Sequence, residues 1–109
     1  MNSRTNILNS ELERFVGILK DKYHPEKVIV FGSQASGKIH TWSDLDVAII
    51  KKTNKPFIDR LKEVALLTSP DIGCDILVYT PEEFATMSKE NLFVKEEIIK
   101  RGRVVYETN

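Results

Sequence analysis

The apolar and polar positions of the chain follow helical and strand periods in turn. Near the N-terminus, apolar residues recur at helical spacing, and Asn9 or Ser10 stands where a capping residue is expected. These apolar positions are Leu12, Phe15, Val16, Leu19 and Tyr23. The pattern predicts an amphipathic helix that begins after Asn9 or Ser10 and stops at His24-Pro25.

Short runs of β-branched and aromatic residues predict strands. The first run is unbroken and ends at Gly32, which is typical of a strand buried on both faces. Turn-forming residues separate the later runs from their neighbours. The predicted strands are Val28–Phe31, Asp44–Ile50, Cys74–Tyr79 and Val104–Tyr106.

Helical patterns separate the later strands. Apolar residues between Phe57 and Thr68 share one helix face, and Thr80-Pro81-Glu82-Glu83 has the composition of a helix N-terminus. A further helix is predicted from about Ser88 to Arg101, with Gly102 as its stop. The order of elements predicts an α/β (α+β) fold with a small mixed sheet and helices packed against it. With 109 residues and no break in composition, residues 1–109 are expected to form a single domain.

Composition narrows the classes of function. The chain is 41% hydrophobic and 29% charged, as expected of a soluble globular protein. Its 16 basic and 16 acidic residues cancel, so charge gives no support for direct nucleic-acid binding. No leader or membrane-length apolar run is present, which favours a cytoplasmic protein without membrane contact. The single cysteine, Cys74, excludes an internal disulfide, and two histidines are too few for a typical histidine-based zinc site.

The chemically informative stretch lies between the first two predicted strands. Gly32-Ser33 follows the first strand, and Asp44-Leu45-Asp46 opens the second, where alternation turns both carboxylates to one face. Asp75 opens the third strand, and it completes a three-acid cluster if that strand lies beside the second. Crowded carboxylates favour a hard divalent cation, so Asp44, Asp46 and Asp75 are the predicted ligands of Mg²⁺ or Mn²⁺ in a two-metal centre.

The glycine-serine corner, Gly32-Ser33, suits the binding of phosphate rather than of metal. A tight turn of small residues offers the backbone amides and the hydroxyl of Ser33 to phosphate oxygens. Phosphoryl transfer requires alignment and charge neutralisation and no covalent nucleophile on the protein. The simpler interpretation, a solvated strand edge at Asp44-Leu45-Asp46, does not account for the glycine-serine corner or for Asp75.

Gly32-Ser33 with Asp44-Leu45-Asp46 resembles the signature of the DNA polymerase β-like nucleotidyltransferase superfamily, and the best fit is its minimal (MNT) branch. The resemblance implies that Gly32 and Ser33 contact the triphosphate of ATP. It implies that Asp44 and Asp46 bind both metals, and that Asp75 binds one metal and helps to activate the acceptor hydroxyl. One departure is Ser36, where many relatives have arginine. Lys38 or Arg60 could supply that charge, but neither is assigned to the site.

Other conspicuous residues have ordinary structural interpretations. His40 and Trp42 suit an exposed loop tip better than a base-stacking site. Cys74, on the opposite strand face from Asp75, is expected to pack in the core. The lysines of Lys51–Lys55 suit a solvated linker. Apolar residues of the first helix and near the C-terminus are expected to fill the core, with part of that surface left for association with a partner or a second copy.

The resemblance also implies a biological role. Minimal members are often partners of HEPN-domain toxins, which the nucleotidyltransferase neutralises as an antitoxin, in some cases by adenylylating a tyrosine. The expected reaction is attack of an acceptor hydroxyl on the α-phosphate of ATP, with the acceptor supplied in trans because the chain is short. Two alternatives stay open: a nucleotide-binding antitoxin that neutralises its partner by contact alone, and transfer to a small molecule.

Overall fold

The computed structural model describes residues 3–108, and most of its elements agree with the sequence patterns. All four predicted strands are present, each within one residue of its predicted bounds at either end. The elements, in chain order, are α1 (Ser3–Lys22), β1 (Lys27–Phe31), α2 (Ser33–Ser36), β2 (Leu45–Ile50), α3 (Phe57–Thr68), β3 (Cys74–Tyr79), α4 (Pro81–Glu90), η1 (Val94–Lys100) and β4 (Arg103–Glu107).

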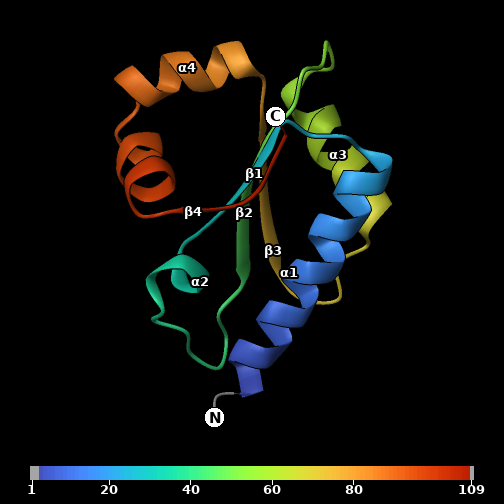
Figure 1. The fold of residues 1–109 in the computed structure, drawn as a ribbon, viewed down its shortest axis with the longest axis vertical. Helices are drawn as coiled ribbons and strands as arrows, with labels where there is room; N and C mark the ends of the chain where they lie inside the picture. The colour runs from blue at the N-terminus through green and yellow to red at the C-terminus, as the bar shows by residue number, and fades with distance from the viewer. Residues whose placement is uncertain (1–2, 109) are drawn as a thin grey trace.

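The strands form a mixed sheet in the order β3-β2-β1-β4. β1 runs antiparallel to both β2 and β4, whereas β2 and β3 are parallel and are joined by the crossover helix α3. Helices α1 and α3 lie on one side of the sheet, and α4 and η1 lie on the other (Figure 1). This arrangement confirms the predicted α/β fold with a small mixed sheet.

Strand alternation divides the core into two clusters. On β2, Leu45, Val47 and Ile49 face α1 and α3, where they pack with Phe15 and Leu19. Alternate residues of β1, β2 and β3 face α4 and η1 in a smaller cluster. Its buried members are Ile29, Phe31, Ala48, Ile50, Tyr79, Val94 and Ile98. The second face therefore has less apolar filling, and the candidate site lies on it.

Helix α1 begins earlier than predicted. Asn9 and Ser10, the predicted caps, lie inside a helix that starts at Ser3. Leu8 is fully buried and extends the apolar stripe by one turn toward the N-terminus. Arg4, one turn further back, donates a hydrogen bond to the carbonyl of Ser43 (2.9 Å). Tertiary contacts therefore extend the helix past residues that have a high capping preference.

The predicted helix from Ser88 to Arg101 is in fact two elements. Ser88 belongs to the end of α4, and Asn91 interrupts the helical path with an extended backbone. The Asn91 side chain accepts a hydrogen bond from the amide of Val94 (3.0 Å), which caps the helical turn at Leu92 and Phe93 that leads into the π-helical segment η1. The break turns η1 back across the sheet, where Val94 and Ile98 are buried.

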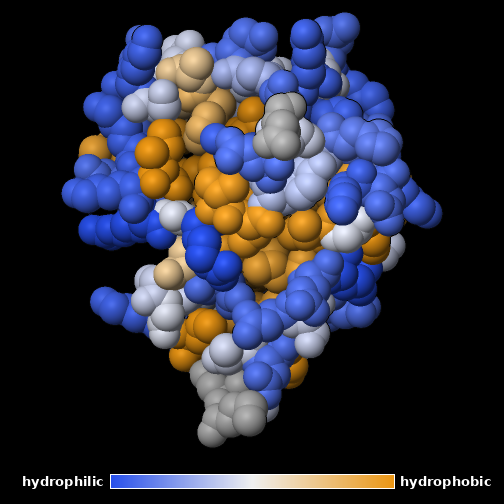
Figure 2. Space-filling view, in the orientation of Figure 1, coloured by the Kyte–Doolittle hydropathy of each residue, from blue (hydrophilic) through white to orange (hydrophobic). Residues whose placement is uncertain are grey.

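Apolar side chains remain visible in the middle of the face shown in Figure 2, flanked by polar side chains over the helices. Val104 of the edge strand β4 is 48% exposed, and Ile99 of η1 is 46% exposed. Among residues 3–108, no helix combines the length and apolar character needed to cross a lipid bilayer.

Candidate functional site

Three site residues stand in one row across the sheet. Asp46 of β2 pairs in register with Asp75 of β3 on one side and with Phe31 of β1 on the other. Neighbouring strands are ~4.8 Å apart, and residues in register project to the same face. The parallel pairing of β2 and β3 therefore brings Asp46 and Asp75 together, which meets the condition on which the sequence analysis placed Asp75 in the site.

The two carboxyl groups are too close to be charged independently. Burial, then the hydrogen bond and charge of Asp75 and the charge of Asp44, raise the pKa of Asp46 to about 7. Below about pH 7, Asp46 is therefore mostly protonated and can share its proton with Asp75. A divalent cation would relieve this crowding by replacing the shared proton, so these two side chains fit a metal with oxygen ligands.

Gly32 forms the corner between β1 and α2, and its backbone requires glycine. Its φ of 71° and ψ of −145° lie in a region that other residues rarely adopt. A Cβ at this position would also overlap the carboxylate of Asp46. Ser33 then begins α2, and Gln34 donates a hydrogen bond to Asn9 of α1 (2.5 Å). The predicted phosphate corner is thus in direct contact with the acid pair.

Asp44 does not join the pair directly. It precedes β2, and its carboxylate lies against Gly73, where a Cβ would overlap it. The amide of Leu45 donates to the Gly73 carbonyl (3.0 Å), which fixes the two chain segments side by side. Within residues 3–108, no three histidine, cysteine, aspartate or glutamate side chains are arranged to hold a metal ion. The structure therefore brings together two of the three predicted ligands.

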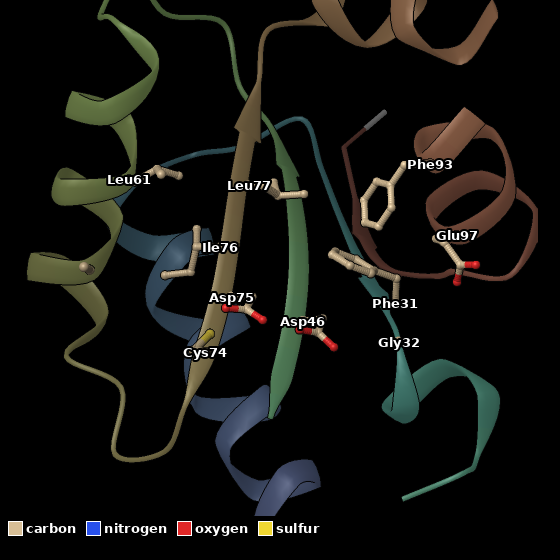
Figure 3. A pocket seen from close by; sticks show the side chains of 11 residues that line it. Phe31, Gly32, Asp46, Leu61, Cys74, Asp75, Ile76, Leu77, Phe93 and Glu97 are labelled. Atoms are coloured by element: carbon tan, nitrogen blue, oxygen red, sulfur yellow. The ribbon is translucent and has the colours of Figure 1, made fainter. Parts of the chain in front are cut away.

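A cavity of about 740 Å³ opens beside the acid pair, and it contains residues that the sequence did not indicate. Asp46, Asp75 and Gly32 line it together with Phe93 and Glu97, which come from the segment at and just before η1 (Figure 3). No local motif marks these last two residues, because they reach the cavity through the break at Asn91 and the turn of η1. Leu61 of α3 and Ile76, on the opposite face of the edge strand β3, line its other end.

A buried ionic contact holds the turn that leads into β3. Glu11 of α1 receives two hydrogen bonds from Arg14 (2.7 and 3.0 Å) and one from the amide of Asp71 (2.8 Å). The bond from Arg14 is the main cause that lowers the pKa of Glu11, so Glu11 stays ionised although it is buried. This contact fixes the start of β3, and with it the position of Asp75.

The two suggested substitutes for the missing arginine differ in their surroundings. Arg60 is buried and bonds to Glu83 (2.7 Å) and to the Val78 carbonyl (3.1 Å), so its charge is already matched. Lys38 and Ser36 are both exposed on the segment after the glycine-serine corner. Arg60 is therefore a structural residue.

Trp42 and Cys74 agree with their ordinary structural interpretations, whereas Lys51 is partly buried and donates a hydrogen bond to the Tyr23 carbonyl rather than lying in a solvated linker. Trp42 is 83% exposed in the loop before β2. Cys74 packs against the larger apolar cluster, on the opposite strand face from Asp75, and burial raises the pKa of its thiol to about 12. A thiol with such a pKa is a poor nucleophile at neutral pH.

Comparison with known proteins agrees with the geometry. Residues 13–109 match the family described as polymerase beta, nucleotidyltransferase. The chain is similar to a candidate protein adenylyltransferase of Methanocaldococcus jannaschii, at 30% identity over 97 residues that cover 87% of this chain and 94% of that protein.

Solved structures share the fold at lower identity. A candidate nucleotidyltransferase from Sulfolobus solfataricus superposes with a TM-score of 0.63 at 19% identity, over 94% of this chain and 81% of that one. A toxin-antitoxin structure with AMP-PNP has a TM-score of 0.61 at 21% identity, over 89% and 73%. A mutant of the toxin-antitoxin MntA-HpeT has a TM-score of 0.60 at 19% identity, over 89% and 72%.

Proposed function

Because this chain belongs to the polymerase beta family of nucleotidyltransferases, we propose that it transfers AMP from ATP to a hydroxyl group of a partner protein. The observation that carries the proposal is the pairing of Asp46 with Asp75 in contact with the Gly32 corner. Placing two acids close enough to share a proton lowers the stability of the folded protein, and binding of a metal-triphosphate complex would offset that cost.

Asp46 and Asp75 would hold a divalent cation, Mg²⁺ or Mn²⁺, and Asp44 would join them by rotation of its side chain away from Gly73. The metal supplies charge neutralisation at the phosphates and aligns the reacting oxygens. The backbone at Gly32 and the hydroxyl of Ser33 would bind the β- and γ-phosphates. The absence of a side chain at Gly32 leaves room for this contact beside Asp46.

The transfer step needs one proton acceptor. The acceptor hydroxyl forms a bond to the α-phosphorus while the bond from that phosphorus to the pyrophosphate oxygen breaks. The hydroxyl proton passes to a carboxylate oxygen of Asp75, which is the more exposed member of the pair. Pyrophosphate leaves with the electron pair of the broken bond.

The acceptor and the biological role follow from the relatives. The relative from Methanocaldococcus jannaschii is described as a candidate protein adenylyltransferase, and two structures of the same fold are toxin-antitoxin systems. We therefore propose that the acceptor lies on a toxin partner, of the HEPN class, and that transfer neutralises it. The apolar surface at Val104 and Ile99 is available for such a complex.

The test is incubation with Mg²⁺ and ATP labelled at the α-phosphate, in the presence of a co-expressed partner or a cell extract. Label is expected on a discrete protein, and Asp46→Asn/Asp75→Asn is expected to lower its rate by ~10³-fold. Asp71→Asn is the matched control, because Asp71 is an exposed carboxylate on the turn before β3 and lies outside the cavity. Equal labelling by all three proteins would refute the proposed mechanism.

A second candidate function is neutralisation of the partner by contact alone. It is favoured by the exposed Ser36 in place of arginine and by the position of Asp44 against Gly73. Co-expression of the partner with Asp46→Asn/Asp75→Asn separates the two functions. Growth that depends on the intact acids supports transfer, and full neutralisation by the variant supports contact alone.

A further inference from the structure

The row of in-register residues across the sheet runs from Asp75 through Asp46 to the aromatic residue Phe31. Phe31 lies next to Asp46 in register, about one strand spacing away (~4.8 Å), and two spacings from Asp75. The Phe31 ring packs against Phe93 edge to face, with 5.7 Å between ring centroids and 88° between planes. The cavity therefore has an acidic end and an aromatic end on the same strand face.

Phe93 is the accessible member of the aromatic pair. Phe31 is 7% exposed and belongs to the core, whereas Phe93 is 47% exposed and lines the cavity. A half-exposed phenylalanine that is held edge to face by a buried one offers a flat apolar surface in a fixed orientation. Such a surface suits a nucleobase, because stacking on an aromatic ring needs a preset plane.

Glu97 lies one helical turn beyond Phe93 and lines the same cavity (Figure 3). Its carboxylate bonds to Arg101 (3.1 Å), and its side chain is 38% exposed. This ion pair leaves carboxylate lone pairs free to accept further hydrogen bonds, since each ionised carboxylate has about four acceptor positions. A carboxylate beside a stacking ring selects a ligand that carries hydrogen-bond donors.

We propose that Phe93 and Glu97 recognise the nucleoside of the donor nucleotide, Phe93 by stacking on the base and Glu97 by accepting a hydrogen bond from a sugar hydroxyl or an exocyclic amine. The inference rests on the proposed function, since it assumes a triphosphate at the acid end. Phe31 lies about one strand spacing from Asp46, and Phe93 packs on Phe31 with 5.7 Å between ring centroids, so a sugar would bridge a phosphate held at the acids and a base stacked on Phe93.

The test is direct titration of nucleotide into the protein with Mg²⁺, which reports affinity without turnover. Phe93→Ala is expected to weaken ATP binding about 10-fold, and Phe93→Tyr to retain it, because stacking contributes a factor of this order. Phe57→Ala is the matched control: Phe57 is 36% exposed and contacts Tyr79 (6.1 Å between centroids) away from this cavity. Wild-type affinity in Phe93→Ala would overturn the stacking role.

Glu97→Ala is expected to weaken ATP binding about 10-fold through loss of a charge-assisted hydrogen bond. Glu96→Ala is its control, because Glu96 forms an equivalent ion pair with Lys100 (3.6 Å) but does not line the cavity. The bonded group is identified by titrating 2′-deoxyATP, 3′-deoxyATP and purine riboside triphosphate, which lacks the exocyclic amine. The effect of Glu97→Ala should disappear for the nucleotide that lacks that group.

Two results would overturn the role of Glu97: unchanged affinity in Glu97→Ala, or an equal loss for all four nucleotides, which would indicate a general charge effect. Failure of the wild-type protein to bind any of these nucleotides would instead contradict the proposed function itself. Unchanged nucleotide affinity in Phe93→Ala combined with slower transfer would assign the aromatic end to the acceptor and overturn the proposal.

Discussion

Two regions of the protein each place a charged side chain away from solvent beside a more exposed partner, and they do so with opposite combinations of charge. Arg60 and Glu83 form an ion pair (2.7 Å), and Glu83 also completes a capping box with Thr80 at the start of α4. Asp46 and Asp75 place like charges together, and their crowding raises the pKa of Asp46 to about 7. The first region satisfies its charges within the protein, whereas the second requires a proton or a ligand.

The first region, Arg60 with Glu83, supports the fold, whereas the second, Asp46 with Asp75, is suited to binding a ligand. Arg60 bonds to Glu83 and to the carbonyls of Lys55 and Val78, and thereby joins α3, β3 and α4. The Asp46 and Asp75 pair contributes no comparable link and lies at the wall of a cavity. Substitutions in the first region should therefore change stability, and those in the second should change ligand binding while leaving the fold intact.

The largest effect on stability is expected for Arg60→Ala. The Arg60 side chain is 7% exposed and its partner Glu83 is 43% exposed. Loss of this ion pair, and of the hydrogen bonds to the carbonyls of Lys55 and Val78, should lower the unfolding free energy by about 3 kcal/mol. Lys55→Ala is the control, because its pair with Glu63 (2.9 Å) is exposed and contributes less than about 1 kcal/mol. Urea denaturation measures both, and similar losses would contradict the structural role of Arg60.

Gly32→Ala should destabilise the protein by about 2 kcal/mol and also abolish nucleotide binding. The cost combines an unfavourable backbone conformation with overlap between the new Cβ and the Asp46 carboxylate. Gly37→Ala isolates the first cause, the backbone conformation, because Gly37 also has a positive φ of 79° but open space around its Cβ position. It should cost about 1 kcal/mol and retain nucleotide binding. Equal losses of stability and of nucleotide binding in the two variants would show that overlap with the Asp46 carboxylate makes no contribution.

Asp46→Asn should stabilise the metal-free protein at pH 8, by roughly 1 kcal/mol, and not at pH 4. The folded pKa of about 7 exceeds the ordinary value of 3.8, so the folded state binds more protons than the unfolded state between these values. The stability of the wild type therefore falls as pH rises through this window, and asparagine removes that loss. Thermal melts with a chelator measure the difference, and a gain that is independent of pH would contradict the shared-proton arrangement.

The smallest effect is expected for Ser36→Arg, which introduces the cation that the resemblance to the family implies at this position. Ser36 is exposed, so stability should not change, while ATP affinity should rise a few-fold and lose that gain at high salt. Ser36→Gln provides a control of similar length without charge. Titration of ATP at low and high salt measures the effect, and an equal gain from glutamine would exclude a charge contact.

The positions of the strands were predictable from the sequence because they depend on patterns that local residues carry, whereas their pairing was not. The β-branched runs and their turn residues fixed the four strands, and a parallel neighbour for β2 was the condition on which the prediction for Asp75 depended. Gly32 was also predictable as a corner, although its contact with the Asp46 carboxylate was not. Backbone alternation specifies the face of a side chain, but not its rotamer.

The remaining features depend on contacts between distant segments. Asp44 shares the predicted face with Asp46, yet its side chain rests against Gly73 because the bond from Leu45 to Gly73 brings that segment alongside. Phe93 and Glu97 enter the cavity because Asn91 ends one helix and caps the next. Periodicity cannot reveal such a break, since Asn91 falls within an apparently continuous helical pattern.

The position of β4 in the sheet has a consequence for the order of folding during synthesis. β4 pairs with β1, although more than seventy residues separate Lys27 from its partner Glu107. Until the ribosome has produced this segment, β1 keeps one free edge with unpaired amides and carbonyls. η1 lies between α4 and β4, so the wall that bears Phe93 and Glu97 also docks late. The nascent chain should therefore acquire its acid pair before it acquires the wall of the cavity that bears Phe93 and Glu97.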